Sequence, residues 1–338
     1  MAVMKDVAKL AGVSVSTVSF VLNGTAKEHK VADGTALKVV KAAKQLGYKI
    51  NSSACDTNGV HVWQPTITFF MPVDSVWMDM NVIIASINKH RKQIGRDYNL
   101  LLCPYEKNHL KDKLETVQRS AYDSAVISIE SETDLKTLEE QAEDLPFVIY
   151  NYISKKYPSV SYLADEAIEK AVKMIVAKGF RNLLVLSGSD SWQHGDEYLN
   201  MFIRCCKNSG IHLLEENFIA TENTMIGGAI GARHILNMET KPEVIICMNS
   251  TLAFGAIPLL ARNHFLIPRD AELLCFGSSG DADHIVNYIP SLSMIARPID
   301  EITMKAFDIA LHLMEGKGAE PVHYTCSCDL LLHDSFSL

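Results

Sequence analysis

The chain has 338 residues, of which 48% are hydrophobic and 21% charged, and its formal net charge is −8. This length predicts two or three compact units with sizeable cores. No apolar run of 18 or more residues occurs, which argues against a membrane-spanning helix. The N-terminus lacks the basic stretch and long apolar core of a secretory signal. Eight cysteines without a framework spacing indicate reduced, buried thiols, so we expect a cytoplasmic protein.

The charge is unevenly distributed along the chain. Residues 1–60 contain eight lysines, no arginine and four acidic residues, which gives +4, whereas the remainder carries −12. Contacts to phosphate need cations close to the duplex. The asymmetry favours a DNA-facing head on an acidic body, although an ordinary solvated lysine face is the alternative.

The first 49 residues have the pattern of three helices. A short helix over residues 6–10 is followed by Gly12, which suits a left-handed turn, and by Ser14, which suits the N-cap of a second helix. On a helix over residues 15–23, Val18, Val21 and Leu22 fall on one face, and Ser16, Phe20 and Asn23 fall opposite. A third helix is expected over residues 34–46, with Val39, Val40, Ala43 and Leu46 in its core.

Two short helices joined by a glycine turn, with polar side chains outward on the second, are what a major-groove reader requires. The run KDVAKLAGVSVSTVSFVLNG at residues 5–24, followed by KAAKQLGY, resembles the headpiece of the lactose-repressor/galactose-repressor (LacI/GalR) family. A three-helix bundle without DNA contacts is the alternative. Outward Ser and Thr at the start of the second helix favour DNA binding, because they have little packing purpose.

The resemblance implies a set of DNA-binding residues. It places Val15 and Ser16 at the principal base-reading positions and Phe20 at a third. The remaining positions are expected near phosphates or bases, or at the helix cap: Ser14, Thr17, Ser19, Asn23 and Thr25. Phe20 can contact a thymine methyl but cannot donate to guanine, and the headpiece has no arginine, so we expect half-sites that contain A·T pairs.

Residues 50–65 are polar and predict a hinge or linker. In the family, this segment folds on DNA into a short helix whose leucine wedges into the minor groove. Asn51 and Ala54 fit that pattern, but Asp56 and Thr57 depart from it, since Thr57 is too short and polar to separate bases well. We therefore expect weaker DNA bending than in typical relatives. A flexible linker is the alternative, because Ser, Asp, Thr and Asn are poor helix residues.

From residue 66 onward, short apolar runs alternate with helix-length amphipathic runs. This alternation predicts parallel sheets covered by helices on both faces, divided over two sheets. The expected helices include residues 165–178, 250–263 and 300–316. The expected strands are residues 66–71, 99–103, 125–129, 147–150, 182–186, 244–247, 272–276 and 292–295.

By resemblance, residues 66–338 form an effector-binding and dimerisation domain with the two-lobed α/β fold of periplasmic binding proteins, in which each lobe is a Rossmann-like parallel sheet. The chain is expected to cross between lobes near Ala164, Pro290 and Thr325. The N-terminal lobe is then residues 66–163 and 292–324, and the C-terminal lobe is residues 164–291 and 325–338.

The expected effector-binding residues lie at strand ends and in loops near the cleft between the lobes. Relatives place charged groups for sugar hydroxyls near Tyr198, at Ser250 and near Gly277, and all three are replaced here, which argues against an ordinary sugar. Trp192 and Tyr198 are candidates for stacking on a ring, and Asn249 for hydrogen bonding. For each candidate, a satisfied loop or core residue is the alternative. The complete set is Asp74, Trp77, Glu130, Asn151, Trp192, His194, Tyr198, Asn249 and Ser250.

No other chemistry is expected. The run Gly277-Ser278-Ser279-Gly280 is not a nucleophile elbow, and one Cys-x-Cys pair at Cys326 and Cys328 lacks the spacing of a zinc site. We therefore predict no cofactor, no metal and no enzymatic activity.

The sequence predicts a transcription regulator, with repression expected, that binds a palindromic operator as a homodimer and responds to a sugar or other metabolite. A tetramer remains an alternative assembly. The alternative function is a small-molecule sensor with a weakened or lost DNA-binding role. An α/β enzyme would need a nucleophile and base constellation that the sequence does not show.

Overall fold

The computed structural model describes residues 3–22, 25–26, 29–46, 64–73, 79–117, 122–129, 131–141, 146–154, 156–188, 197–314 and 322–337. Three helices form the N-terminal headpiece: α1 (Met4–Ala11), α2 (Val15–Leu22) and α3 (Asp33–Gln45). Their shared core contains Val7, Val18 and Val39, each fully buried. The expected core residue Leu46 is instead 36% exposed, because α3 ends one residue before it.

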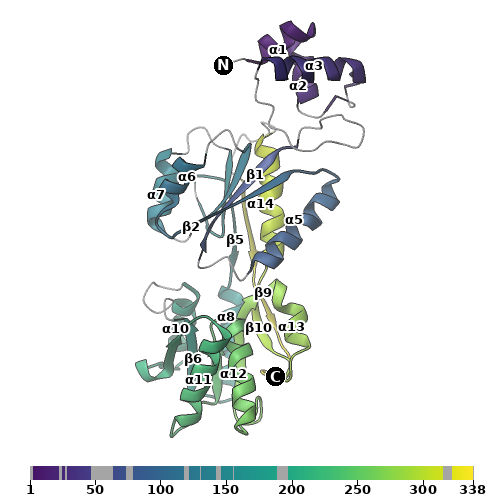
Figure 1. Cartoon of the computed structure of the whole chain (residues 1–338). Coiled ribbons are helices and arrows are strands. Elements are labelled where there is room, and N and C mark those ends of the chain that lie inside the picture. Colours follow the sequence, from purple (N-terminus) through teal and green to yellow (C-terminus); the bar gives the residue numbers. More distant parts are fainter. Residues whose placement is uncertain are drawn as a thin grey trace. The chain divides into compact units, whose positions relative to one another are not determined.

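The rest of the described chain alternates strands and helices around two sheets (Figure 1). The first sheet has the order β11-β5-β4-β3-β1-β2. Its strands are β1 (Thr66–Pro72), β2 (Asn99–Tyr105), β3 (Ser124–Ser128), β4 (Phe147–Tyr150), β5 (Ser159–Leu163) and β11 (His323–Ser327). The associated helices are α5 (Met80–Ile94), α6 (Leu110–Thr116), α7 (Glu132–Gln141) and α14 (Ile299–Met314). The β1 pairings with β2 and β3 and the β3 pairing with β4 are parallel, as the alternation predicts.

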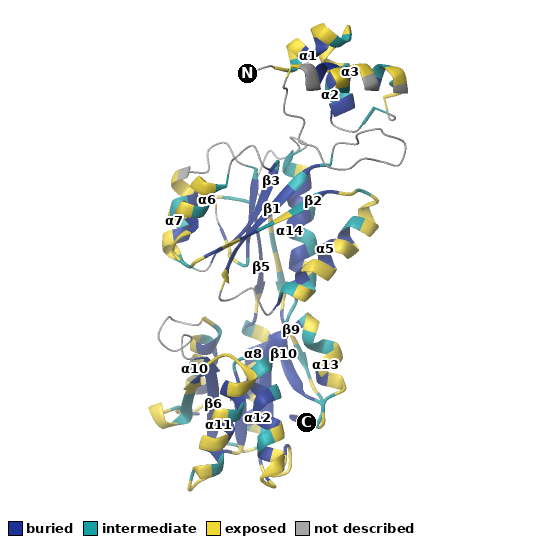
Figure 2. Cartoon of the chain, in the orientation of Figure 1, coloured by how far each residue is buried: buried dark blue, intermediate teal, exposed yellow. Residues whose placement is uncertain are grey.

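The second sheet has the order β12-β10-β9-β8-β6-β7. Its strands are β6 (Leu183–Gly188), β7 (Phe218–Thr221), β8 (Val244–Cys247), β9 (Glu272–Ser278), β10 (Ser293–Arg297) and β12 (Asp329–Leu331). The helices are α8 (Asp165–Ala177), α10 (Glu197–Asn208), α11 (Met225–Asn237), α12 (Ser250–Arg262) and α13 (Ala282–Val286), with 3₁₀ turns η3 (Glu215–Asn217) and η4 (Ser279–Asp281). In this sheet β7, β6, β8, β9 and β10 pair parallel with their neighbours, and β12 pairs antiparallel with β10. The central strands β6, β8, β9 and β10 are buried and dark blue in Figure 2, whereas the edge strands β7 and β12 are partly exposed.

The chain divides into two units that alternate along the sequence. The first contains residues 1–77, 87–159 and 304–323, and the second contains residues 78–86, 160–303 and 324–338. The crossings near residues 159 and 323 lie close to the expected positions. The expected crossing near Pro290 is wrong: β10 belongs to the second sheet, and the chain changes unit at residues 303–304. A strand buried on both faces is a plain apolar run, so its sequence does not say which sheet it joins.

Eight predicted strands are present, with ends that differ by up to two residues. The prediction missed β5, β7, β11 and β12. The strands β7 and β12 are only four and three residues long, and β11 alternates between exposed and half-buried residues at a sheet edge. Short edge strands carry little of the continuous apolar signal that identifies central parallel strands.

Candidate nucleic-acid interface and ligand site

The turn between α1 and α2 is built as the sequence predicts. Gly12 ends α1 in the left-handed conformation at φ 67°. Ser14 precedes α2, and its hydroxyl accepts a hydrogen bond from the backbone N–H of Thr17 at 3.0 Å. The two hydroxyls of Ser14 and Thr17 also lie 2.8 Å apart. This arrangement satisfies one of the free backbone donors at the helix start and fixes where α2 begins.

The start of α2 presents its side chains to solvent. Ser14, Val15 and Ser16 are exposed, and Val15 exposes 41% of its surface. Thr17 and Ser19 are half-buried. The opposite face is the core side, where Val18, Val21 and Leu22 are at most 6% exposed. An apolar residue as exposed as Val15, beside the exposed Ser16, fits a surface that meets a partner.

Phe20 differs from the sequence-based expectation of a free outward ring. It is half-buried, and its ring stacks on the imidazole of His29 with centroids 3.6 Å apart and planes inclined by 15°. The carbonyl of Phe20 accepts hydrogen bonds from the backbone N–H of Thr25 at 2.9 Å and from its hydroxyl at 3.3 Å. Thr25 therefore satisfies a backbone carbonyl in the last turn of α2.

Some of the predicted site residues lie outside the described residues. For the DNA-binding set these are Asn23, Asn51, Ala54 and Thr57. For the effector-binding set these are Asp74, Trp77, Glu130, Trp192 and His194. The described effector candidates divide between the units, with Asn151 in the first and Tyr198, Asn249 and Ser250 in the second.

Asn249 and Ser250 among the described effector candidates are held by hydrogen bonds within the protein. Asn151 follows β4 with a left-handed φ of 61°. Asn249 caps α12, since its side chain accepts the Thr251 N–H at 2.8 Å. Ser250 is 3% exposed, and its hydroxyl donates to the Asp281 carboxylate at 2.9 Å. These are the hydrogen bonds expected of satisfied structural residues.

Tyr198 packs against another tyrosine. Its ring stacks on Tyr162 with centroids 5.7 Å apart and planes inclined by 14°. Its hydroxyl donates to the hydroxyl of Tyr162. Burial is the main cause that raises the pKa of Tyr198, and the neighbouring Tyr162 raises it further. Burial likewise raises the pKa of Tyr162, whose hydroxyl also receives a hydrogen bond from Arg297. Both phenols therefore stay protonated at neutral pH.

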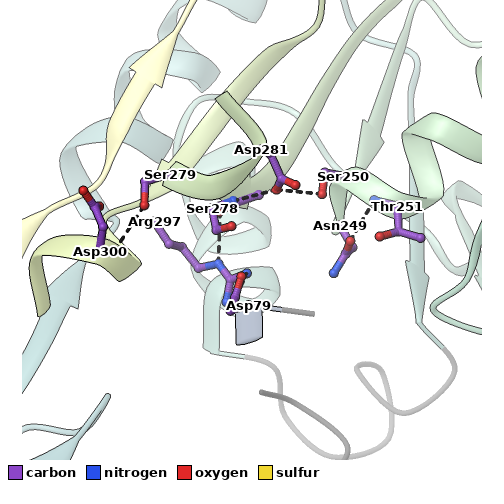
Figure 3. A network of polar contacts seen from close by, with 10 residues as sticks. Asp79, Asn249, Ser250, Thr251, Ser278, Ser279, Asp281, Arg297 and Asp300 are labelled. Carbon is purple, nitrogen blue, oxygen red and sulfur yellow. Dashed lines mark hydrogen bonds and ion pairs between the residues drawn. The ribbon is translucent and has the colours of Figure 1, made fainter. Parts of the chain in front are cut away.

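Arg297 belongs to a network of polar side chains in the second unit (Figure 3). Its guanidinium lies 3.1 Å from the Asp79 carboxylate, and its Nε donates to the Gly277 carbonyl at 3.0 Å. The side chains expose only 25% and 8% of their surfaces. Burial by itself would lower the pKa of Arg297, but Asp79 and the two tyrosines more than compensate, so its pKa is raised and the cation is retained.

A second carboxylate, Asp281, organises the neighbouring polar groups. It accepts the Ser250 hydroxyl at 2.9 Å and the Ser278 backbone N–H at 2.9 Å, as Figure 3 shows. Ser278 and Arg297 are the last residues of β9 and β10, and Ser250 begins α12 three residues after the end of β8. Ligands of open parallel sheets bind at this edge.

Sequence reasoning missed Asp79, Tyr162, Asp281 and Arg297. A charged residue at the end of a predicted strand was a usable signal for Arg297. Asp79 offered none, since it lies 218 positions before its partner.

Comparison with known proteins identifies the chain. Residues 3–51 match the model of the lacI family of bacterial regulatory proteins, and residues 172–336 match a periplasmic binding protein-like domain. The PurR transcriptional repressor of Vibrio vulnificus is 27% identical over 99% of this chain and 98% of its own length.

This chain carries a lacI-family headpiece. Solved members of the family share its fold. A lacI-family regulator from Clostridium acetobutylicum covers 80% of the chain and 99% of its own, with a TM-score of 0.73 and 23% identity. The lac repressor dimer, solved with operator and the anti-inducer ONPF, covers 100% of the chain and 99% of its own, with a TM-score of 0.71 and 18% identity.

With this headpiece and a repressor aligned over 99% of its length, the chain is a DNA-binding transcription regulator and not an enzyme. In the described part of the chain, no helix is long and apolar enough to cross a membrane, and no group of three or more His, Cys, Asp or Glu side chains is arranged to hold a metal ion. Burial raises the pKa of the Cys206 and Cys247 thiols to about 12. These thiols are neutral at physiological pH and are therefore poor nucleophiles.

Proposed function

We propose that this regulator binds a palindromic operator as a homodimer, represses transcription from it, and changes its DNA affinity when its α/β domain binds a small-molecule effector. The observation that carries the proposal is the start of α2, where Ser14, Val15 and Ser16 are exposed next to an intact cap. Exposed polar groups at the N-terminus of a second helix are the base-reading element of helix-turn-helix proteins. A cytoplasmic location follows from this role.

In this proposal Val15 and Ser16 read base edges, and Phe20 lies beside a third position. Neither Val15 nor Phe20 donates a hydrogen bond, and no arginine is present in residues 1–60. Preference therefore comes from contacts to thymine methyl groups and favours A·T pairs. The flanking residues contact phosphates or support the helix: Ser14, Thr17, Ser19, Asn23, Thr25 and the hinge residues Asn51, Ala54 and Thr57.

The dimer of the proposal uses the surface where α11, α12 and the segment after α13 meet. Ile226 is 72% exposed and Ile289 is 90% exposed, far more than isolated monomers usually allow for large aliphatic side chains in one region. The three elements are contiguous. A Cβ built on Gly255 of α12 would lie 1.9 Å from the Met225 carbonyl oxygen of α11, Tyr288 donates to the Phe254 carbonyl at 2.8 Å, and the Phe254 and Tyr288 rings lie 5.2 Å apart. The lac repressor dimer supports a twofold assembly for this chain.

The effector of the proposal differs from an ordinary sugar. Two carboxylates of the polar network in the second unit are already engaged: Asp79 pairs with Arg297, and Asp281 accepts from Ser250 and Ser278. A polyhydroxyl ligand needs fixed donors and acceptors that are free to bind it. We therefore expect a metabolite with fewer hydroxyl groups and more planar or apolar surface, for which the sugars serve as negative controls.

The test begins with selection of binding sites from random duplexes by the full chain. We expect inverted half-sites rich in A·T pairs, and we expect Ser16→Ala to weaken binding to the selected duplex about tenfold, the loss of one good base contact. Invariant guanines opposite residues 15, 16 and 20 would contradict the reading proposal. If the chain selects no duplex but shows a thermal shift with a metabolite, the alternative of a sensor without DNA binding is correct.

Self-association is measured independently by sedimentation. Ile289→Asp buries a charge in the proposed interface and should dissociate the dimer, whereas Leu214→Asp, at a residue 59% exposed on a different segment, should leave it intact. An unchanged dimer in the first variant would place the interface elsewhere.

A further inference from the structure

The strongest unexplained contact in the headpiece is the stack of Phe20 on His29. The rings lie 3.6 Å apart and are inclined by 15°, which is close parallel overlap. His29 is nevertheless exposed, and its backbone N–H donates to the Thr25 carbonyl at 3.1 Å. The imidazole is thus fixed at both its backbone and its ring while its edge faces solvent.

In the proposed function, the stack lies on the side of α2 that faces DNA. Phe20 follows Ser16 by four residues, so the two side chains are neighbours on one face of the helix. Ser16 is exposed at the start of that face, and Phe20 lies one turn further on. Because His29 covers one face of the Phe20 ring, only the remaining ring surface of Phe20 is available to a thymine methyl.

The ring nitrogens of His29 can form hydrogen bonds to a ligand. Among the described residues, no group hydrogen-bonds to the ring nitrogens of His29. A neutral imidazole always carries one N–H donor, and an imidazolium carries two. The neighbouring Lys30 is exposed as well, so two donors stand together beside the reading helix.

An exposed imidazole beside the recognition helix is well placed to bind phosphate. Residues at the N-terminal end of a recognition helix reach base edges, whereas groups beyond the helix meet the sugar-phosphate walls of the groove. Hydrogen bonds to an ionised phosphate are about twice as strong as those between neutral groups. The headpiece lacks the arginines that commonly supply such contacts.

We propose that His29 is a DNA-contacting residue that donates a hydrogen bond to an operator phosphate, and that Phe20 is its positioning residue through the stack. The pair then acts as one unit, in which Phe20 fixes the imidazole plane before DNA binds. Preorganisation of this kind adds affinity because less side-chain freedom is lost in the complex. This inference rests on the proposed DNA-binding function.

The test measures affinity of the full chain for two fluorescent duplexes, the one that the wild-type protein selects and a scrambled duplex of the same composition. The variants are His29→Ala, Phe20→Ala, the double variant and Phe20→Tyr, which retains the stacking ring. An exposed histidine of the second unit, His212, supplies the matched control His212→Ala. Circular dichroism confirms that each variant keeps its helices.

We expect His29→Ala to weaken binding to both duplexes by about five- to tenfold, the loss of one charge-assisted hydrogen bond. In the Phe20→Ala background, His29→Ala should lower DNA affinity by less than about twofold, because the Phe20 ring no longer holds the imidazole in place. Phe20→Tyr should restore the full effect of His29→Ala, and His212→Ala should bind as wild type does.

Three outcomes overturn the inference. Unchanged DNA affinity in His29→Ala would show that His29 does not contact DNA. An equal loss of affinity from His29→Ala in the wild type and in Phe20→Ala would show that Phe20 does not position His29. A loss confined to the selected duplex assigns His29 to a base rather than a phosphate. Failure of the wild-type protein itself to bind either duplex is a different result, since it contradicts the proposed function and not the stack.

Discussion

A single methyl group at Gly255 tests how α11 and α12 are held together. A Cβ at this position would lie 1.9 Å from the carbonyl oxygen of Met225 and 2.7 Å from its carbonyl carbon. Gly228 shows the reciprocal approach, where a Cβ would lie 2.2 Å from the Leu252 carbonyl oxygen. Both contacts are to backbone, so no side-chain rotation relieves them. Gly255→Ala therefore requires the two helices to separate.

The size of the effect follows from that geometry. Close C···O contacts in proteins are about 3.3 Å, so the helices must move apart by roughly 1.4 Å. A gap of about 0.5–1 Å already forfeits a quarter to a half of the dispersion energy of the atoms concerned. Overpacking of this kind costs about 1–3 kcal/mol, and the better helix propensity of alanine offsets up to about 1 kcal/mol. We expect a net loss of about 1–2 kcal/mol.

Urea unfolding of the full chain measures the change, and Gly34→Ala supplies the control. Gly34 lies in α3 with nothing within 4 Å of a built Cβ, so the same substitution should be neutral or stabilise by up to about 1 kcal/mol. Because Met225 and Phe254 adjoin the proposed dimer surface, sedimentation should also show weaker self-association in Gly255→Ala. A Gly255→Ala protein as stable as wild type would refute the reasoning, since the helices would then tolerate separation at no cost.

Three further predictions concern the headpiece cap, the ion pair and a buried histidine. Ser14→Ala should cost about 1 kcal/mol of headpiece stability and lower DNA affinity about fivefold, because the Thr17 N–H loses its acceptor. A double-mutant cycle of Asp79→Asn and Arg297→Met should give a coupling of about 1–3 kcal/mol in urea unfolding. Burial lowers the pKa of His90 below 6.5 despite the opposing influence of Asp308, so the unfolded chain binds a proton that the folded chain does not. Stability should therefore fall as the pH drops below about 6.5, by at most about 1.4 kcal/mol per pH unit from this group, and His90→Leu should remove that contribution.

Each of these predictions has an outcome that contradicts it. A cap that matters only structurally would leave Ser14→Ala with full DNA affinity once the protein is folded. A coupling below about 0.5 kcal/mol would show that solvent screens the Asp79–Arg297 pair. Identical slopes of stability against pH in the wild type and His90→Leu would show that His90 has the same pKa in the folded and the unfolded chain.

The headpiece could be predicted from sequence because its signals are local. Gly12 and Ser14 determine the ends of two helices through their own backbone and cap contacts. The spacing of Val18, Val21 and Leu22 determines which face is buried. The α/β class was equally accessible, since alternation of apolar and amphipathic runs predicts parallel sheets without reference to distant residues.

Side-chain partners far apart in sequence could not be predicted in this way. Helical projection places Phe20 outward, yet His29 from the following loop covers its ring. The sequence makes Tyr198 a candidate for stacking on a ligand, whereas Tyr162 already occupies one face of its ring.

The sequence by itself determined the reading helix, its cap, the absence of arginine and the α/β class of the body. Only the tertiary structure decided that β10 joins the second sheet, and that Arg297 pairs with Asp79 at 3.1 Å. The physical reason is the distance along the sequence over which each interaction acts. Caps and helical faces depend on neighbours within one or two turns, but sheet membership and ion pairing depend on which segments the fold brings together. The exposed start of α2 is therefore predictable from local sequence, while the Phe20–His29 pair beside it is not.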